Sequence, residues 1–272
     1  MKDYKEEFAL NPVTKEQIVF ALQLGGIEKG DVVMMHSALS SIGYVEGGAE
    51  TVVDAVLEAV GPEGTYAVST MNGSHPFDPE NAPSTVGIIS EKHRLRPNSI
   101  RSLRPVHSIN AIGARAEELT KDHDKCETNC GEGSPYLKLR DMGAKIILLG
   151  VDMNRNTTLH AIEDLMDSVY LINREVPAPM YMDDYENKTM VMRKFCPGHR
   201  DFLRFTPELR RAGALIETRI GDAVAKIIDV RKMFELGQKL LKEKPLFFLC
   251  ENANCPFCSN AQRLQAEKDA KG

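Results

Sequence analysis

The stretch LLGVDMNRNTTLHAIE at residues 148–163 decides the fold, because it carries a strand, a polar turn and the start of a helix. Residues 145–151 form a strongly apolar run that predicts a buried strand. In the turn, Asn156 or Thr157 can accept a hydrogen bond from a free N–H of the first helical turn. The stretch therefore predicts a strand–turn–helix unit, from which α/β sheets are built.

The predicted helix has two unlike faces. At 100° per residue its polar members share one narrow sector, namely His160, Glu163, Asp164 and Asp167. Its apolar members lie opposite, namely Leu159, Ile162, Leu165, Met166 and Val169. The polar face thus presents an imidazole and three carboxylates at the carboxyl end of a strand, where open α/β sheets bind ligands. The alternative is a solvated acidic face with an incidental histidine.

A second strand–loop–helix unit precedes it. The run 31–36 predicts a buried strand, and the hydroxyl-rich loop 37–48 leads to a helix over 49–60 that Gly61 and Pro62 end. Such a loop offers free N–H groups and the positive end of a helix dipole, so it can hold phosphates. It matches neither a Walker loop nor a Rossmann fingerprint.

Length and strand pattern predict one α/β domain over residues 1–272, with a Cys-rich tail at 246–272. The apolar runs lie at 31–36, 65–70, 109–113, 145–151, 188–195 and 223–230. Helical patterns alternate with the first four runs. We therefore expect an α/β/α sandwich with a largely parallel central sheet and additional C-terminal antiparallel strands.

The formal net charge of −5 argues against nucleic acid as a partner and suits a cationic ligand. The charged N-terminus precedes no apolar segment, so we expect no signal peptide, and no apolar run is long enough to span a membrane. We expect a cytoplasmic monomer or homodimer that binds no membrane.

The six cysteines, without a secretory signal, indicate thiols or metal ligands rather than disulfides. Cys250, Cys255 and Cys258 lie together, and the last two have the spacing of a zinc half-site. Cys196 and His199 form a second half-site around a tight turn. We expect any such metal to be a structural zinc far from the chemistry; the alternative is a reduced, packed terminus.

Six segments together resemble the aminoglycoside 3-N-acetyltransferase family, the acetyl-coenzyme A-dependent antibiotic acetyltransferases that are not built on the GNAT fold. The matching pieces are 36–43 with 47–52, 76–79 with 83–87, 101–102, 105–108, 133–135, and 148–151 continuing through 156–160 to Glu163. Two departures stand out. Arg104 replaces a histidine found in many members, and residues 70–75 differ from the usual loop that faces the antibiotic.

The resemblance implies acetyl transfer from acetyl-coenzyme A to the 3-amino group of an aminoglycoside, which gives antibiotic resistance. His160 is then the expected base, because an imidazole titrates near neutrality, and Glu163 orients it or attracts the cationic acceptor. Thr158 or a backbone N–H would stabilise the thioester oxygen as it becomes negative. No nucleophile motif is present, which favours direct transfer over an acyl-enzyme.

Two further groups of candidates follow. The coenzyme A candidates are Ser37, Ser40, Ser41, Gly43, Gly47, Gly48, Thr85, Val86, His107 and Ser108. The acceptor candidates are Asp78, Asp152, Glu163, Asp164 and Asp167, since a carboxylate-lined cleft attracts an ammonium-rich ligand. For His107, a buried structural role is the alternative.

Other functions remain open from the residues alone. One alternative is an acetyltransferase that acts on an amine other than an aminoglycoside. A second alternative is a metal-dependent hydrolase with His36, His107, His160 and Asp152 as ligands, although no metal-binding spacing supports it. A third is a non-enzymatic interaction protein that acts through its cysteine-rich tail.

Overall fold

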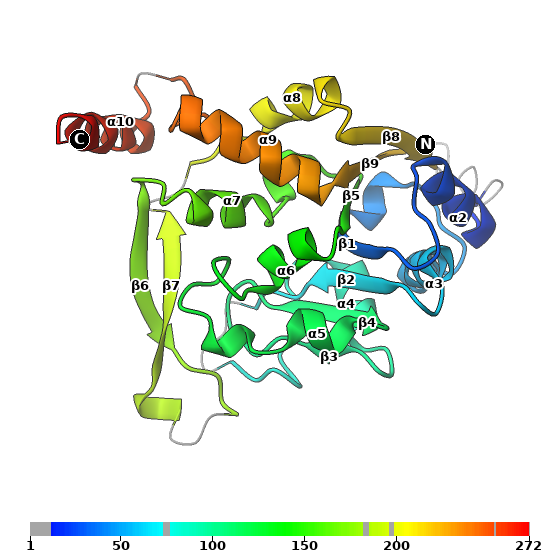
Figure 1. Cartoon of the computed structure of the whole chain (residues 1–272). Helices are drawn as coiled ribbons and strands as arrows, with labels where there is room; N and C mark the ends of the chain where they lie inside the picture. Colours follow the sequence, from blue (N-terminus) through cyan, green and yellow to red (C-terminus); the bar gives the residue numbers. More distant parts are fainter. Residues whose placement is uncertain (1–11, 73–76, 182–184, 196–198, 253, 272) are drawn as a thin grey trace, which may run out of the picture.

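The computed structural model describes residues 12–72, 77–181, 185–195, 199–252 and 254–271. Its centre is a seven-stranded sheet in the order β3-β4-β2-β1-β5-β9-β8 (Figure 1). The strands are β1 Val32–Ser37, β2 Thr65–Ser69, β3 Ile100–Arg101, β4 Ile109–Gly113, β5 Lys145–Leu149, β8 Leu215–Ile220 and β9 Ala223–Asp229. Five of the six apolar runs of the sequence thus form the inner strands of the sheet, whereas the run 188–195 forms a strand outside it.

The α/β class and the antiparallel C-terminal strands are as expected, but the parallel part is smaller than predicted. Only β2, β1 and β5 run parallel, while β9 and β8 continue the sheet antiparallel to them. On the other side, β4 is antiparallel to β2. The reason is that the chain crosses from β2 to the edge strand β3 and returns as a hairpin into β4.

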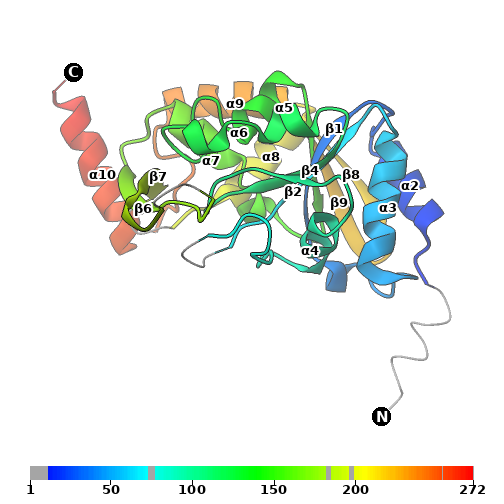
Figure 2. The ribbon, with the colours of Figure 1, turned by 90° about the horizontal axis from the view of Figure 1, so that it is seen from below.

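Helices cover both faces of the sheet (Figure 2). Alternate residues of β1 supply the two cores, with Val32 and Met34 in one and Val33 and Met35 in the other. The second core includes α2 Lys15–Leu24, α3 Gly48–Val60 and α4 Ile88–Arg94. The first includes α5 Ala116–Thr120, α6 Pro135–Asp141, α7 Leu159–Leu165, α8 Phe205–Arg211 and α9 Val230–Glu243.

Two elements lie outside this sandwich. The strands β6 Leu171–Pro177 and β7 Thr189–Phe195 pair only with each other, as an antiparallel hairpin beside α7 (Figure 1). The last helix, α10 Pro256–Asp269, closes the described chain at the same end of the molecule. Short 3-10 turns join the elements: η1 Leu39–Ser41, η2 His123–Lys125, η3 Met153–Arg155, η4 Tyr185–Asn187 and η5 Phe202–Arg204.

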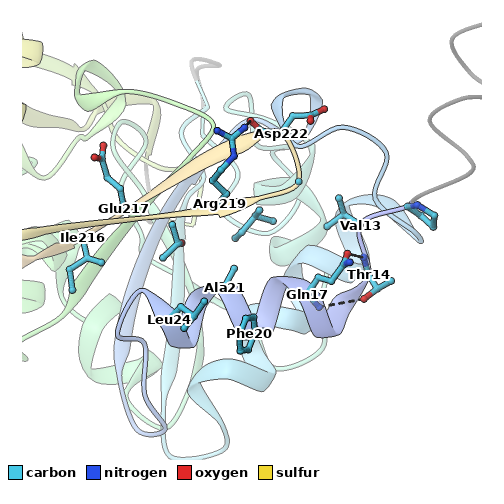
Figure 3. Close-up of a pocket in the computed structure, with 14 residues that line it drawn as sticks. Val13, Thr14, Gln17, Phe20, Ala21, Leu24, Ile216, Glu217, Arg219 and Asp222 are labelled. Carbon is cyan, nitrogen blue, oxygen red and sulfur yellow. Dashed lines mark hydrogen bonds between the residues drawn. The ribbon is translucent and has the colours of Figure 1, made fainter.

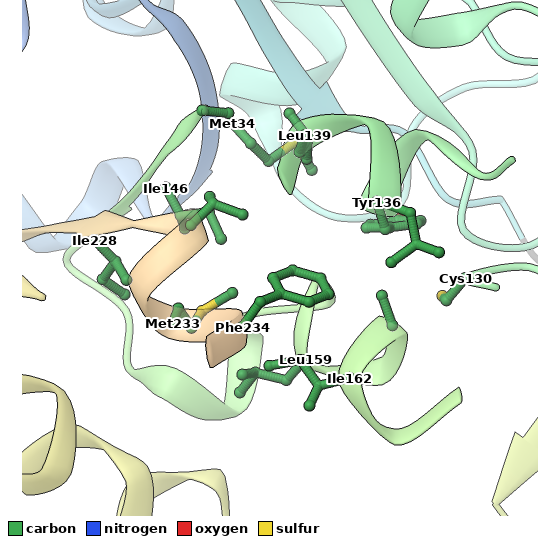
Figure 4. Close-up of a cluster of buried hydrophobic side chains, with 14 of the residues drawn as sticks. Met34, Cys130, Tyr136, Leu139, Ile146, Leu159, Ile162, Ile228, Met233 and Phe234 are labelled. Carbon is green, nitrogen blue, oxygen red and sulfur yellow. The ribbon is translucent and has the colours of Figure 1, made fainter. Parts of the chain in front are cut away.

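Helix α7 is held by its apolar side. Leu159 and Ile162 pack beside Met233 and Phe234 of α9 within one buried cluster (Figure 4). Removing a buried leucine side chain of this kind costs about 2–5 kcal/mol, so the orientation of the helix is strongly determined. The residues that follow on α7 are placed by this contact.

The helix is shorter than the sequence predicts. It ends at Leu165, and Asp167 adopts a left-handed backbone with φ 45°. Asn156 does accept a backbone hydrogen bond, from Thr158 N at 3.2 Å, just before the first helical residue. Asp167 therefore does not continue the polar face of the helix.

A groove of about 1020 Å³ lies between α2 and the edge strand β8, lined by residues that include Gln17, Phe20, Ile216 and Arg219 (Figure 3). It contains none of the site residues predicted from the sequence. None of the described helices combines the length and apolar character needed to cross a bilayer.

Candidate active site

A histidine and a glutamate on α7 form the centre of the site. His160 and Glu163 are one helical turn apart, and Nδ1 of His160 lies 2.8 Å from Oε2 of Glu163. An ionised carboxylate only accepts hydrogen bonds, so Nδ1 carries the proton and Nε2 of the neutral ring keeps its lone pair. The His160 side chain is 32% exposed, and the pair therefore presents an accessible base.

The carboxylate of Glu163 is fully buried and satisfied by three side chains. Arg200 donates from Nε to Oε1 and from Nη2 to Oε2, both at 2.8 Å, and the Tyr170 hydroxyl donates to Oε1 at 3.2 Å. Burial alone would raise the pKa of this carboxyl. The charge of Arg200 and the hydrogen bond to His160 lower the pKa by more than burial raises it, so the pKa lies below its usual value. Glu163 stays ionised and orients His160.

This environment corrects one prediction for Glu163. Both carboxylate oxygens are occupied and the side chain has no exposed surface, so it cannot also bind an acceptor amine. The helical projection assumed that the polar face of α7 meets solvent. Arg200, 37 residues away in the chain, instead binds Glu163, whereas His160 and Asp164 stay partly exposed.

Arg200 was not predicted from the sequence. It lies in the segment between β7 and η5, and neither periodicity nor a motif marks it. Its guanidinium carbon also lies 5.4 Å from the centre of the Tyr170 ring, a cation–π contact. The rule that a buried carboxylate needs a cationic partner could have indicated such a residue only if the burial of Glu163 had been known.

His107 lies against His160. The two rings stack with centroids 5.6 Å apart and an angle of 18° between their planes. His107 has a left-handed backbone with φ 63°, which is uncommon for a residue other than glycine, and Tyr136 donates to its carbonyl at 2.9 Å. Burial, followed by the neighbouring His160, lowers the pKa of His107 to about 3, so its ring is neutral near pH 7.

The ring of Phe202 also contacts His160, with centroids 5.5 Å apart. Phe202 begins η5, two residues after Arg200. The segment that supplies the partner of Glu163 therefore supplies part of the wall around the base as well.

Two buried polar atoms, one near the carboxyl end of β1 and one at the residue before α7, have no hydrogen-bond partner in the described part of the chain. They are Oγ1 of Thr158 and Nε2 of His36. His36 is paired with Leu148 in the sheet register, and burial lowers its pKa to about 4, so it is neutral. A buried polar group without a partner costs about 1–3 kcal/mol. Such atoms are suited to accept a ligand as their partner.

The predicted cofactor segments come together at this end of the sheet. Ser37 and Leu149 are neighbours in the register of β1 and β5, and Ser41 donates to the Gly150 carbonyl at 3.1 Å. A methyl group placed on Gly87, which precedes α4, would lie 3.8 Å from the Ser37 carbonyl. The segment with Thr85 and Val86 therefore borders the loop after β1.

Within that loop, the residues differ in how open they are. Ser40 and Gly47 are exposed, whereas Gly43 and Gly48 are partly buried. Gly47 immediately precedes α3 with a left-handed φ of 76°, a conformation that favours glycine. The loop thus combines exposed hydroxyl and backbone groups with the start of a 13-residue helix.

Ser108 does not fit a direct cofactor role. Its side chain is fully buried, and its hydroxyl donates to the Thr70 carbonyl at 3.0 Å. The Ser108 side chain therefore stabilises the backbone at Thr70. Arg104, the departure from the family pattern, is also buried and binds Asn129 and the Cys126 carbonyl, so it is a structural residue here.

The predicted acidic residues are largely engaged locally. Asp78 accepts from the backbone of Glu80 and Asn81, and Asp152 accepts from Asn154 N at 2.9 Å. Asp164 is partly exposed and accepts from Thr128 at 2.9 Å. They do not form the continuous carboxylate face expected from the sequence, because α7 ends early and Glu163 is buried. Residues 73–75 of the segment 70–75, which the resemblance places against the acceptor, lie outside the described residues.

The three tail cysteines converge with one histidine. The Sγ atoms of Cys250, Cys255 and Cys258 and Nδ1 of His199 all lie within 4.8 Å of one another. Cys196, the other member of the predicted second half-site, lies outside the described residues. In the described part of the chain, this is the one group of three or more His, Cys, Asp or Glu ligands that is close enough for a metal.

The hydrolase alternative receives no support from this geometry. His160 uses Nδ1 for Glu163, and His107 meets it face to face rather than with converging nitrogens. Asp152, the proposed fourth ligand, caps its own turn.

Comparison with known proteins agrees with the resemblance noted from the motifs. The sequence model of the family described as aminoglycoside 3-N-acetyltransferase matches residues 34–242. Aminoglycoside N(3)-acetyltransferase III of Salmonella sp. is 38% identical over 61% of this chain and 66% of its own length. Aminoglycoside N(3)-acetyltransferase VII of Streptomyces paromomycinus is 30% identical over 86% of this chain and 93% of its own length.

Solved structures show the same similarity. A mutant of aminoglycoside acetyltransferase AAC(3)-IVa in complex with gentamicin has a TM-score of 0.84 at 26% identity, covering 93% of this chain and 98% of that one. AAC-IIIb in a binary complex with CoASH has a TM-score of 0.77 at 25% identity, covering 89% of this chain and 100% of that one.

Proposed function

The chain belongs to the aminoglycoside 3-N-acetyltransferase family, and we propose that it transfers the acetyl group of acetyl-coenzyme A to the 3-amino group of an aminoglycoside. The observation that carries this proposal within the structure is the His160–Glu163 pair, which leaves one imidazole nitrogen without its proton. Family membership supports the cosubstrate and the class of acceptor. The biological result of this reaction is resistance to the antibiotic.

His160 acts as the base in this mechanism. As the acceptor nitrogen attacks the thioester carbonyl carbon, Nε2 of His160 takes the proton that the nitrogen must lose. The C–N bond forms, and collapse of the tetrahedral intermediate breaks the C–S bond and releases the coenzyme A thiolate. Glu163 stabilises the resulting imidazolium because its charge is buried beside Nδ1.

Thr158 supplies a donor for the oxygen of the thioester. Its buried Oγ1 has no other partner among the described residues, which favours a hydrogen bond made only when substrate is present. The loop 37–48 and the start of α3 would hold the pyrophosphate through backbone N–H groups, with Thr85 and Val86 at its border.

The acceptor is expected to be cationic. The net charge of −5 favours an ammonium-rich ligand, and Asp164 is the predicted acceptor carboxylate that lies partly exposed on the same helix as His160. Because acetyl-coenzyme A is a cytoplasmic metabolite, the proposed reaction takes place in the cytoplasm.

We also propose that Cys250, Cys255 and Cys258 bind a structural zinc, as the half-site spacing predicts. Their convergence with a histidine supports this, since three thiolates and one imidazole are a common ligand set for closed zinc sites.

The proposed reaction is tested by following release of the coenzyme A thiol with a panel of aminoglycosides and simple amines. We expect acetylation of aminoglycosides, and a loss of roughly 10²–10⁴-fold in kcat for His160→Ala with coenzyme A binding retained. Acetylation of simple amines alone would exclude the antibiotic as acceptor. Wild-type turnover in the His160→Ala variant would exclude His160 as the base.

A further inference from the structure

The cysteine cluster and the catalytic pair are joined by two consecutive residues. Nδ1 of His199 lies 3.1 Å from Sγ of Cys255 and 3.5 Å from Sγ of Cys250. The next residue is Arg200, whose guanidinium donates one hydrogen bond to each carboxylate oxygen of Glu163. Because consecutive Cα atoms are 3.8 Å apart, a displacement of His199 displaces the backbone of Arg200 as well.

We propose that His199 is the fourth ligand of a tetrahedral zinc with Cys250, Cys255 and Cys258, and that this zinc positions Arg200 on Glu163. The inference rests on the proposed acetyl transfer, for which Glu163 orients the base. The sequence predicts a metal far from the chemistry, whereas His199 of the cluster is adjacent in the chain to Arg200, which binds Glu163. Arg200 is then a positioning residue that acts through Glu163.

The ligand atoms, all within 4.8 Å of one another, lie near the spacing of a closed zinc site, which small shifts of the side chains would reach. With Zn–S near 2.3 Å and Zn–N near 2.0 Å, ligand atoms of a tetrahedral site lie roughly 3.5–3.8 Å apart. Here the separations are 3.1 Å and 3.5 Å from His199 to two sulfurs, and 3.3 Å between the sulfurs of Cys250 and Cys258. Zinc would bind the three cysteines as thiolates and the histidine as a neutral imidazole, so any protons on these sulfurs would be released.

Apolar packing holds the tail through one small cluster, in which Cys255, Cys258 and Ala261 pack with Tyr170 and Leu249. Helix α10 has 14 residues, of which Cys258 and Ala261 are buried. A helix of that length is marginal by itself in water, and two small buried side chains add little apolar area. Two of the four ligands, Cys255 at the residue before the helix and Cys258 in its first turn, would instead attach α10 through the metal.

The segment after His199 transmits this attachment to the site. Asp201 N donates to the Phe248 carbonyl at 2.8 Å, and Arg204 donates to the Leu249 carbonyl at 2.8 Å. The segment 199–204 is therefore laid along the chain that leads to Cys250. It carries both Arg200 and Phe202, which contact Glu163 and His160 respectively.

Loss of this alignment has a defined consequence. Glu163 is fully buried, and a buried carboxylate that loses its cation is destabilised. The carboxyl would then take up a proton or admit water, and Nδ1 of His160 would lose the acceptor that fixes its tautomer.

The metal itself is measured first, by elemental analysis of protein purified without added metal. We expect about one equivalent of zinc, lost in Cys250→Ser, with Cys126→Ser as a matched control. Cys126 is a partly exposed thiol outside the cluster that bonds to the Asp122 carbonyl. Exchange with Co²⁺ should give a thiolate-to-cobalt charge-transfer band. Less than about a tenth of an equivalent in the wild type, or zinc retained by Cys250→Ser, overturns the site.

The positioning role is measured by a double-mutant cycle. We expect Cys250→Ser to lower kcat roughly 10-fold to 100-fold, with the KM for acetyl-coenzyme A nearly unchanged. In an Arg200→Lys background the same substitution should change kcat by less than about twofold, because both act through Glu163. The positioning role of the zinc is overturned if the kcat losses of Cys250→Ser and Arg200→Lys multiply in full in the double mutant. It is also overturned if zinc-free Cys250→Ser keeps the wild-type kcat.

A readout without turnover separates this inference from the proposed function. The Nδ1–H proton of His160, hydrogen-bonded to a buried carboxylate, should give an NMR signal that persists with zinc and disappears after the metal is removed. Persistence of that signal in zinc-free protein overturns the link. Absence of acetylation in a zinc-loaded protein that shows the signal would count against the proposed function alone.

Discussion

The substitution Glu163→Gln tests the centre of the site without changing its shape. Oε2 of Glu163 accepts from His160 and Arg200, and Oε1 accepts from Tyr170 and Arg200. An amide replaces one of these oxygens by an NH₂ group, which donates. Whichever oxygen is replaced, the NH₂ group faces a nitrogen donor of Arg200, so the four hydrogen bonds cannot all be kept.

The effect on turnover follows from the two orientations of the amide. If the NH₂ group faces His160, Nδ1 must accept and Nε2 must carry the proton, so the base is lost and kcat falls by up to about 10⁴-fold. If the oxygen faces His160, the tautomer survives but the charge that stabilises the imidazolium is gone. A hydrogen bond to a charged group contributes about 1.5–3 kcal/mol, so the second orientation lowers kcat roughly 10-fold to 150-fold.

The assay is steady-state release of coenzyme A thiol, combined with thermal unfolding. The KM for acetyl-coenzyme A should change little, whereas the free energy of unfolding should fall by about 3–5 kcal/mol, because Arg200 is left without its counter-charge. Glu118→Gln is the matched control: Arg115 binds Glu118 through two nitrogens at 2.8 Å and 2.7 Å, but that pair is exposed. The control should keep its kcat and lose less than about 1 kcal/mol. A folded Glu163→Gln enzyme with kcat within threefold of wild type would refute the orienting role.

Two further outcomes are expected. If the loop before α3 binds the pyrophosphate, Gly47→Val should weaken coenzyme A binding about tenfold, as measured by calorimetry. The control is Gly30→Val, which strains a left-handed φ in another turn and should lower only stability. Equal affinities of the two variants for coenzyme A would contradict the assignment of the loop. Burial lowers the pKa of His93 to about 4, so this histidine stabilises the fold above its unfolded pKa near 6.5, and that contribution is lost as the pH falls toward 4. Between pH 6.5 and pH 5 this loss of stability is about 2 kcal/mol. The test is urea unfolding at pH 7 and pH 5, in which the free energy of unfolding of His93→Gln should depend less on pH than that of the wild type. An unchanged pH dependence would exclude His93 as a source of the acid destabilisation.

Features set by near neighbours in the chain could be predicted from the sequence. The run 145–151 contains β5, which starts at the same residue and ends two residues earlier, and the run 31–36 matches β1 to within one residue at each end. His160 and Glu163 meet because a helix brings residues three apart to the same face. The stop of α3 at Gly61, with φ 68°, follows from the same local rules.

Features that depend on residues distant in the chain could not be predicted from the sequence. Strand β8 was missed because Glu217, Thr218 and Arg219 interrupt the apolar run that a doubly buried strand would have. The direction of β4 depends on whether the chain before it forms a crossover or a hairpin, and the apolar pattern of a five-residue strand is the same in both. Arg200 is invisible for the same reason, since a single arginine in a loop has no period.

The burial of Glu163 links these two kinds of feature. A helical wheel assigns an angle to each side chain but not the layer that covers it, and so it placed Glu163 in solvent. An uncompensated carboxylate could not be buried at that angle, so its position in the core requires the cation that the segment 199–204 provides. That segment is in turn held by bonds to the chain before Cys250. The charge state of one residue on α7 therefore depends on a segment that itself bonds to Phe248 and Leu249, and this chain of contacts is the basis for proposing that the tail acts on the active site.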